Sequence, residues 1–166
     1  MLVVDHDRAT RDAVAHTLLA EGYRVFAAPD GATALAIIEW ARQAGGRQFA
    51  LILLDLWTPG MDGWQFAARY RQLPGPHAPI IIAAAEPGAV AALHAEQIGA
   101  AGFLTKPFDL EALPSFIAGC VQADGAPSAS HVDGAPRPAH GGAQGGPFTR
   151  LPQARRSHFR RVTSAV

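Results

Sequence analysis

Residues 51–63, LILLDLWTPGMDG, decide how this chain folds. The apolar run 51–54 has the length and composition of a buried strand, and it ends on the charged residue Asp55. In open α/β sheets, ligands bind outside the carboxyl ends of the parallel strands. A carboxylate at that end of a buried strand is therefore expected to have a function.

Lys106 is the second residue on which the interpretation depends. It is the only lysine in a chain with thirteen arginines, and it follows another apolar segment, GFLT at residues 102–105. Pro107 comes directly after it. An acid and an amine at the ends of two buried strands predict a charged site.

Short apolar runs alternate with helical patterns through the first 121 residues. The expected strands are residues 2–4, 23–27, 49–54, 79–84 and 102–105, and the expected helices are residues 8–21, 31–44, 61–73, 87–97 and 109–121. Pro114 predicts that the last helix starts late or bends. This alternation predicts an α/β protein with a flavodoxin-like (βα)5 fold, a doubly wound parallel sheet with strand order 2-1-3-4-5.

The composition changes after residue 121, which divides the chain into two parts. Residues 1–121 hold 8 basic and 12 acidic residues, whereas residues 122–166 hold 6 arginines and 2 aspartates and are rich in Gly, Pro and Ala. The second part lacks hydrophobic periodicity, so it is predicted to be a disordered basic tail. A solvated tail is preferred to a nucleic-acid-binding segment, and out-of-frame readthrough of a GC-rich gene also fits this composition.

Several classes of protein are disfavoured by simple counts. The single cysteine, Cys120, rules out a disulfide framework and reads as a buried structural thiol. The sequence has no apolar run long enough to span a membrane and no recognisable signal peptide, so we expect a cytoplasmic protein without a membrane partner. The short first strand also suggests that the natural start lies upstream of Met1.

The expected strand order brings charged side chains together at one edge of the sheet. Asp5 follows the first strand, Asp55 ends the third and Lys106 follows the fifth. Neighbouring carboxylates repel each other unless a cation lies between them, and Mg²⁺ prefers oxygen ligands, of which one or two are carboxylates. A carboxylate beside Mg²⁺ and an ammonium group is arranged for phosphoryl transfer.

These residues resemble the receiver domain of two-component response regulators, over residues 1 to about 121. Residues 51–63 resemble the segment that carries the phosphoacceptor, here Asp55. Residues 99–108, GAAGFLTKPF, resemble the segment that carries the family's lysine and cis-proline, here Lys106 and Pro107. The resemblance covers nearly all of the part that we expect to be structured.

The resemblance implies a set of roles and partners. Asp5, Asp55 and the backbone carbonyl of Trp57 would bind Mg²⁺, and His6 or Asp7 is left open as a further ligand. A histidine kinase or phosphotransfer protein would supply the phosphoryl group. The phosphorylated domain would then signal to a downstream protein through the face formed by the fourth helix, the fifth strand and the fifth helix.

Two departures from the family pattern concern the metal and the switch. His6 replaces the second of two adjacent acids, and an imidazole is a poor ligand for Mg²⁺. Ala84 stands where the family has Thr or Ser to bind the phosphoryl group, and the aromatic switch position holds Phe103, whose ring has no polar group. The alternative is that neither substitution affects function: His6 would be a tolerated loop substitution, and Ala84 an alanine that fills the core.

Two functions therefore stay open. The first is a stand-alone receiver domain without an output domain, which accepts phosphoryl on Asp55 and is not an enzyme. The alternative is a pseudo-receiver that binds proteins independently of phosphorylation. A haloacid dehalogenase-like phosphatase is disfavoured because it needs an aspartate two residues after its nucleophile, where Trp57 stands.

Overall fold

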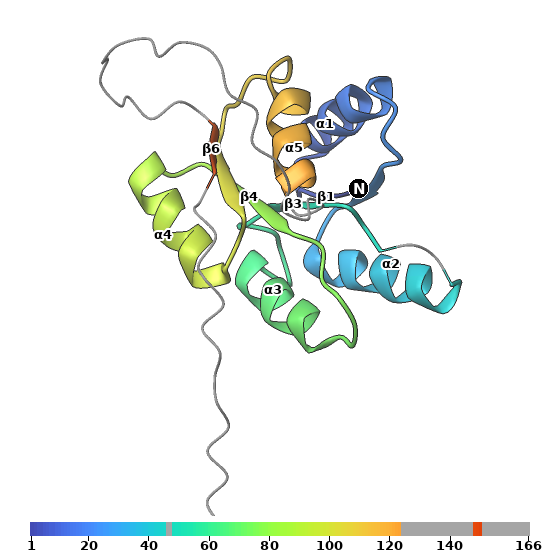
Figure 1. The fold of residues 1–166 in the computed structure, drawn as a ribbon. Coiled ribbons are helices and arrows are strands. Elements are labelled where there is room, and N and C mark those ends of the chain that lie inside the picture. Colours follow the sequence, from blue (N-terminus) through green and yellow to red (C-terminus); the bar gives the residue numbers. More distant parts are fainter. Residues whose placement is uncertain (46–47, 124–147, 151–166) are drawn as a thin grey trace, which may run out of the picture.

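Six strands form one sheet within residues 1–45, 48–123 and 148–150, which are the residues that the computed structural model describes (Figure 1). They are β1 Leu2–Val4, β2 Phe26–Ala28, β3 Ile52–Asp55, β4 Ile80–Ala84, β5 Gly102–Thr105 and β6 Phe148–Arg150. The sheet order is β2-β1-β3-β4-β5-β6, with β1 to β5 parallel and β6 antiparallel to β5. The predicted flavodoxin-like order 2-1-3-4-5 is confirmed.

A helix follows each of the five parallel strands. The helices are α1 Arg8–Ala20, α2 Gly31–Gln43, α3 Gly63–Gln72, α4 Gly88–Ile98 and α5 Leu113–Ala123. Each of the first three is preceded by an aspartate whose side chain accepts a hydrogen bond from the backbone amide three residues later, namely Asp7, Asp30 and Asp62. These caps fix the point at which the chain turns from each strand end into its helix.

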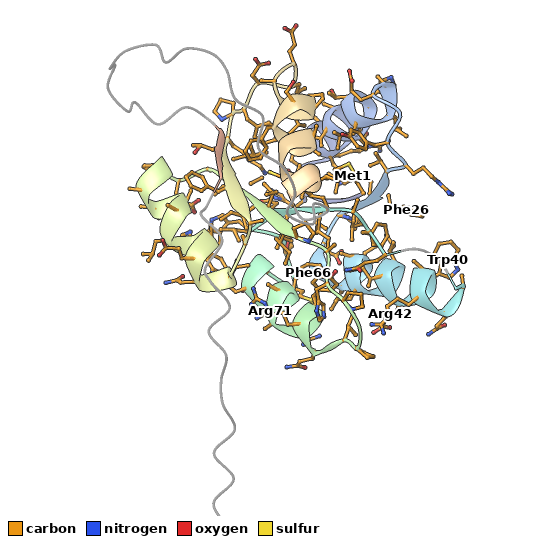
Figure 2. All side chains as sticks on the ribbon, viewed as in Figure 1. Met1, Phe26, Trp40, Arg42, Phe66 and Arg71 are labelled. Atoms are coloured by element: carbon orange, nitrogen blue, oxygen red, sulfur yellow. The ribbon has the colours of Figure 1, made fainter. Side chains whose placement is uncertain are left out.

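The sheet separates two hydrophobic cores, because successive strand residues point to opposite faces. Leu54 packs into the core under α2, α3 and α4, which includes Phe66, whereas Leu53 packs into the core under α1 and α5. Figure 1 shows the same division of the helices between the two faces, and Figure 2 shows side chains filling both layers. Coverage on both faces explains why the strands are continuously apolar.

The predicted starts of β2, β3 and α5 differ from the structure by three or four residues, and the other predicted boundaries differ by at most two. β2 begins at Phe26 rather than at Tyr23, because the Tyr23 amide donates a hydrogen bond to Leu18 O and so helps to end α1. α5 begins at Leu113 rather than at residue 109. Asp109 forms a turn in which its side chain accepts a hydrogen bond from the Glu111 amide, and the late start is the one that Pro114 predicts.

The predicted tail, residues 122–166, lies mostly outside the described residues. Within it the structure describes the end of α5 at residues 122–123 and the strand β6, which pairs with β5. The sequence analysis did not anticipate β6. Among the helices of the described ranges, none combines the length and the hydropathy that a membrane span requires.

Candidate functional site

The ends of β1, β3 and β5 bring two carboxylates and one ammonium group into contact. Val4 pairs with Leu54, so Asp5 and Asp55 leave neighbouring strands side by side. Lys106 Nζ lies 2.8 Å from Asp5 Oδ2 and 3.2 Å from Asp55 Oδ2. Both aspartates are buried, at 4% and 3% exposure. The three residues predicted to form a charged site are therefore assembled around Asp55.

β4 lies between the acids and the lysine and leaves room for their contact. Ala83 pairs with Asp55, and Ala84 pairs with Thr105. The Lys106 amide donates a hydrogen bond to Ala84 O at 2.7 Å, and the Lys106–Pro107 peptide bond is cis. With only methyl side chains at the end of β4, the lysine side chain reaches across that strand to both carboxylates.

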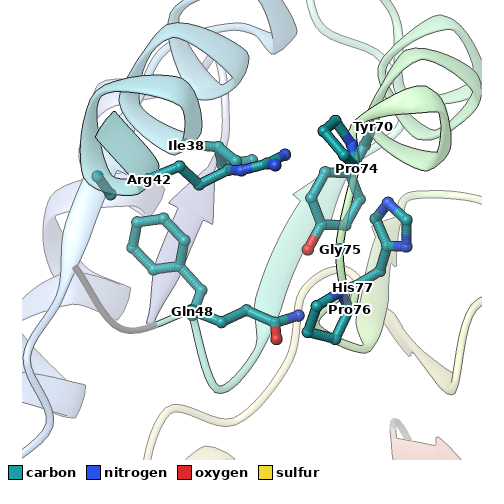
Figure 3. Close-up of a pocket in the computed structure, with 10 residues that line it drawn as sticks. Ile38, Arg42, Gln48, Tyr70, Pro74, Gly75, Pro76 and His77 are labelled. Atoms are coloured by element: carbon teal, nitrogen blue, oxygen red, sulfur yellow. The ribbon is translucent and has the colours of Figure 1, made fainter. Parts of the chain in front are cut away.

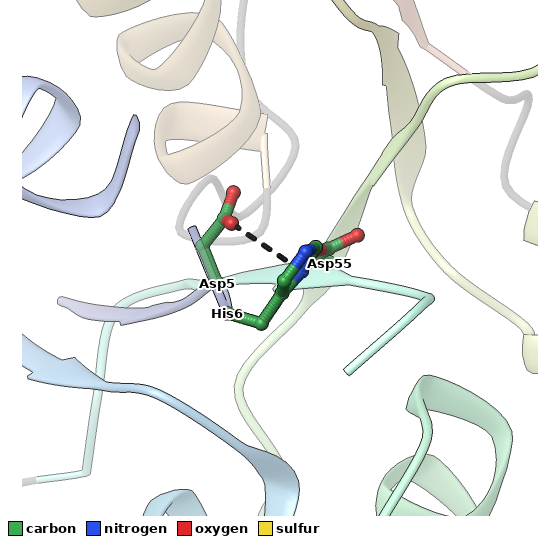
Figure 4. A group of neighbouring side chains, drawn as sticks. All are labelled: Asp5, His6 and Asp55. Carbon is green, nitrogen blue, oxygen red and sulfur yellow. Dashed lines mark hydrogen bonds and ion pairs between the residues drawn. The ribbon is translucent and has the colours of Figure 1, made fainter. Parts of the chain in front are cut away.

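His6 joins this cluster directly (Figure 4). Its Nδ1 lies 2.7 Å from Asp55 Oδ2 and 4.0 Å from Asp5 Oδ1, and the imidazole is 48% exposed. Sequence spacing did not predict a hydrogen bond between His6 and Asp55. The adjacency of β1 and β3 was the available signal, because it places the residue after Asp5 opposite the end of β3.

Asp7 is engaged by the helix that follows it. Its side chain accepts hydrogen bonds from the Thr10 amide at 2.8 Å and the Thr10 hydroxyl at 2.6 Å. These bonds hold the pKa of Asp7 below its ordinary value. The contribution of Asp7 to the cluster is its backbone amide, which donates to Asp5 Oδ1 at 2.9 Å. Its carboxylate is thus committed to capping α1.

Burial dominates the electrostatics of Asp5. It raises the pKa of Asp5 above the ordinary value, Lys106 opposes this rise by donating to the carboxylate, and the neighbouring charge of Asp55 adds to it. Arg11 contacts the backbone here, since its Nη1 donates to Asp5 O at 2.8 Å. Asp5 is therefore a carboxylate whose ionised form depends on a nearby cation.

The loop after Asp55 is held by short internal hydrogen bonds. Thr58 Oγ1 donates to Met61 O at 2.6 Å, and the Gly63 amide donates to Leu56 O at 2.9 Å. A Cβ at Gly63 would lie 2.9 Å from the Leu56 Cα, so this position requires glycine. Trp57 contacts the acceptor through its amide, which donates to Asp55 Oδ1 at 3.3 Å. The loop thereby orients the Asp55 carboxylate.

Aromatic residues cover the side of the site that faces α4. Trp57 packs edge-on against Trp64, with ring centroids 5.3 Å apart, and Trp64 packs against His94 at 5.0 Å. The Trp57 indole also donates a hydrogen bond to Glu86. Sequence spacing did not predict the contact between Trp64 and His94. Their contacts place both beside the loop that carries Trp57.

The predicted switch positions lie in the core. Ala84 is fully buried and Phe103 is 4% exposed, and both belong to the core beneath α2, α3 and α4. Phe103 also lies near the start of α4, because a Cβ built on Gly88 would be 3.9 Å from its ring. The ring therefore already has a buried position in this structure.

A separate cavity lies near the amino-terminal ends of β3 and β4, at the opposite ends of the strands from the charged site (Figure 3). It has a volume of about 320 Å³, and Arg42, Gln48, Tyr70 and His77 are among the residues that line it. The Tyr70 hydroxyl accepts a hydrogen bond from the Ala78 amide, and burial raises the pKa of Tyr70. Asp5, Asp55 and Lys106 do not line this cavity.

The cluster has the composition of a cation site with mixed ligands. One donor atom from each of Asp5, His6 and Asp55 lies within 4.8 Å of the other two. The two carboxylates fit Mg²⁺, which binds hard oxygen ligands and keeps several waters. The imidazole nitrogen of His6 does not belong to the usual ligand set of that ion.

The structure is therefore a flavodoxin-like domain in which two buried carboxylates, Asp5 and Asp55, pair with Lys106. The family described as the response regulator receiver domain matches this chain over residues 1–118. The chain belongs to this family, whose members are regulatory phosphoacceptor domains of two-component systems.

Full-length relatives and solved structures agree with this assignment. The response regulator protein FleR of Pseudomonas aeruginosa is 36% identical over 118 residues, covering 71% of this chain and 24% of FleR. The response regulator MprA of Mycobacterium ulcerans is 36% identical over 113 residues, covering 68% of this chain and 46% of MprA. The chain thus spans from about a quarter to about half of these relatives.

Two solved structures show the same fold. The chemotaxis response regulator CheY4 of Vibrio cholerae superposes with a TM-score of 0.59 at 31% identity, covering 72% of this chain and 95% of CheY4. The receiver domain of NtrX from Brucella abortus superposes with a TM-score of 0.62 at 29% identity, covering 73% of this chain and 97% of that domain.

Proposed function

We propose that this chain accepts a phosphoryl group on Asp55 and transmits that event by protein contacts. The observation that carries the proposal is the pairing of Lys106 with both buried carboxylates, at 2.8 Å and 3.2 Å. A buried carboxylate beside a fixed ammonium group can attack a phosphoryl group whose charge that ammonium neutralises.

The transfer is a simple displacement. A carboxylate oxygen of Asp55 attacks phosphorus in a phosphohistidine, the O–P bond forms as the N–P bond breaks, and the donor imidazole leaves with the electron pair and is protonated by water. Lys106 lies beside Asp55 Oδ2 and neutralises charge on the phosphoryl oxygens. Asp5, Asp55 and the Trp57 carbonyl would hold Mg²⁺, which supplies further charge neutralisation.

The proposal also names partners and a division of the chain. A histidine kinase or phosphotransfer protein donates the phosphoryl group in the cytoplasm, and a downstream protein recognises the α4–β5–α5 face. Residues 1–121 form the receiver module, which regulates rather than turns over a substrate. Residues 122–166 form a basic tail, of which residues 148–150 pair with β5.

Intact-mass spectrometry after incubation with acetyl phosphate and Mg²⁺ tests the proposal. We expect the mass of one added phosphoryl group in the wild type and none in Asp55→Asn. Asp12→Asn is the matched control, because Asp12 is an exposed aspartate on α1 that forms an ion pair with Arg8 outside the site. Labelling that survives in Asp55→Asn contradicts the assignment, and so does a wild type that stays unlabelled both with Mg²⁺ and when Co²⁺ replaces Mg²⁺.

A second candidate function is a pseudo-receiver, and one observation favours it. Ala84 has no hydroxyl to bind a phosphoryl group, and Phe103 is already buried in the same core. A domain in this condition can present a constant surface to a partner whether or not Asp55 is modified. Equal affinity of the phosphorylated and unphosphorylated chain for a captured partner would support this function over the first.

A further inference from the structure

We propose that the site formed by Asp5, His6 and Asp55 prefers a divalent transition-metal ion, of the class of Co²⁺ and Zn²⁺, over Mg²⁺. This inference rests on the proposed phosphoacceptor function and specifies the ion that accompanies it. The observation is the convergence of one imidazole nitrogen and two carboxylates, with donor atoms within 4.8 Å of one another (Figure 4).

The position of His6 allows its imidazole nitrogen to bind an ion that Asp5 and Asp55 hold. Nδ1 already points at Asp55 Oδ2, 2.7 Å away, and lies 4.0 Å from Asp5 Oδ1. Nearly half of the imidazole is exposed, so an ion can approach from solvent between the ring and the carboxylates. Replacing the hydrogen bond to Asp55 by a bond to a shared cation requires Nδ1 to give up its proton, which leaves the imidazole neutral with its hydrogen on Nε2.

The charge of the site disfavours Mg²⁺. Asp5 and Asp55 supply two negative charges, and Lys106 offsets one of them. Mg²⁺ is held mainly by electrostatic attraction to hard oxygens, so a neutral nitrogen in place of a carboxylate removes much of its affinity. Imidazole is a good ligand for first-row transition ions, which therefore lose less or gain.

Asp7 does not restore the missing carboxylate. Its side chain accepts two hydrogen bonds from Thr10 and caps α1. Turning that carboxylate toward Asp55 would leave the Thr10 amide without its partner at the helix start. The available third side-chain ligand is then His6, and its nitrogen sets the preference of the site.

The test compares dissociation constants for Mg²⁺ and Co²⁺ in the full chain, by fluorescence of the tryptophans and by calorimetry. We expect the preference for Co²⁺ over Mg²⁺ to fall roughly tenfold or more in His6→Asp. The matched control is His16→Asp, which makes the same exchange at an exposed position of α1. The visible absorption of bound Co²⁺ gives a second readout, since it reports a nitrogen ligand that His6→Asp removes.

Each outcome decides the question. An unchanged preference in His6→Asp, or an equal change in His16→Asp, overturns the inference. Co²⁺ binding that persists undiminished in Asp55→Asn shows adventitious binding elsewhere and also overturns it. Failure of the proposed function looks different, because acetyl phosphate would then leave Asp55 unlabelled with either ion while the metal preference could still follow His6.

Discussion

The two halves of the site differ in whether their side chains carry polar groups. The transfer half, Asp5, Asp55 and Lys106, is joined by ion pairs of 2.8 Å and 3.2 Å. The switch half, Ala84 and Phe103, is buried and has no side-chain polar atom. Under the proposed function, accepting a phosphoryl group and transmitting its presence would depend on different residues, and one could persist where the other is reduced.

The difference has an energetic meaning. A modification shifts a conformational equilibrium only by the difference between its interaction energies with the two states. Under the proposed function, Lys106 would sense a phosphoryl group on Asp55 by charge, whereas the methyl side chain of Ala84 can neither accept nor donate a hydrogen bond. The two halves can therefore be tested separately, by removing the cation of the transfer half and by adding a hydroxyl to the switch half. The dependence of stability on pH then measures the electrostatic cost of the buried acids.

Lys106→Met should have the largest effect on stability. It leaves the buried carboxylates of Asp5 and Asp55 without their shared cation, and we expect a loss of about 3 kcal/mol in the free energy of unfolding at neutral pH. Urea denaturation measures this loss. Arg8→Met is the control, because the exposed pair of Arg8 with Asp12 is expected to contribute under about 1 kcal/mol. Equal losses in both variants would mean that Lys106 contributes no more to the free energy of unfolding than an exposed ion pair does.

Ala84→Thr should strengthen the response of the switch half by about 2 kcal/mol, the magnitude of a hydrogen bond to a charged group. Hydrogen exchange on residues 84–108, with and without beryllofluoride as a phosphoryl mimic, measures the response. We expect a larger protection change on the α4–β5–α5 face in this variant than in the wild type.

Ala84→Val is the matched control for this experiment. It adds the same bulk as threonine to a fully buried position but brings no hydroxyl. A gain in Ala84→Val equal to that in Ala84→Thr would assign the effect to packing. A wild-type response already as large as that of Ala84→Thr would show that this domain signals without the hydroxyl.

The smallest effect concerns the pH dependence that Asp5 imposes. Because its pKa is raised in the folded state above the ordinary 3.8, the folded protein binds this proton more tightly than the unfolded chain does. The contribution of Asp5 to stability should therefore fall as the pH rises from 3.8 through the raised pKa, and change little below 3.8. The free energy of unfolding of the wild type, minus that of Asp5→Asn, should therefore become smaller or more negative as the pH rises through that window.

Asp12→Asn supplies the reference for the pH series, since Asp12 is an exposed aspartate outside the site. Its difference from the wild type should vary less over the same window. If the wild type instead gains stability relative to Asp5→Asn as the pH rises, Lys106 outweighs burial, and the acids of the transfer half are favourable rather than costly.

The sequence predicted the sheet order and the charged site because both follow from patterns along the chain. Apolar runs that end on Asp55 and Lys106 define strand ends, and the parallel order then brings those ends together. The same reasoning predicted the late start of α5 from Pro114. These features depend on one residue and its neighbours in sequence.

The features that the sequence did not predict depend on contacts between distant segments. The bond between His6 and Asp55 requires the rotamer of an exposed ring, which no periodicity records. The pairing of Trp64 with His94 and the addition of β6 to β5 join parts of the chain with no shared pattern. The late start of β2 is an exception, because it depends on a local hydrogen bond from the Tyr23 amide to Leu18 O at the end of α1.

β6 gives the face around β5 a built-in competitor. Gly102, Phe103 and Leu104 pair through their backbone with residues 148–150 of the same chain. Another molecule can add a strand to this edge only after β6 leaves it, and dilution does not weaken a competitor that belongs to the same polypeptide. Among the described residues, Val90 and Leu93 on α4 have exposed side chains, so a partner that binds them does not have to displace β6. The same face therefore presents two levels of accessibility, one for side-chain recognition and a lower one for strand addition.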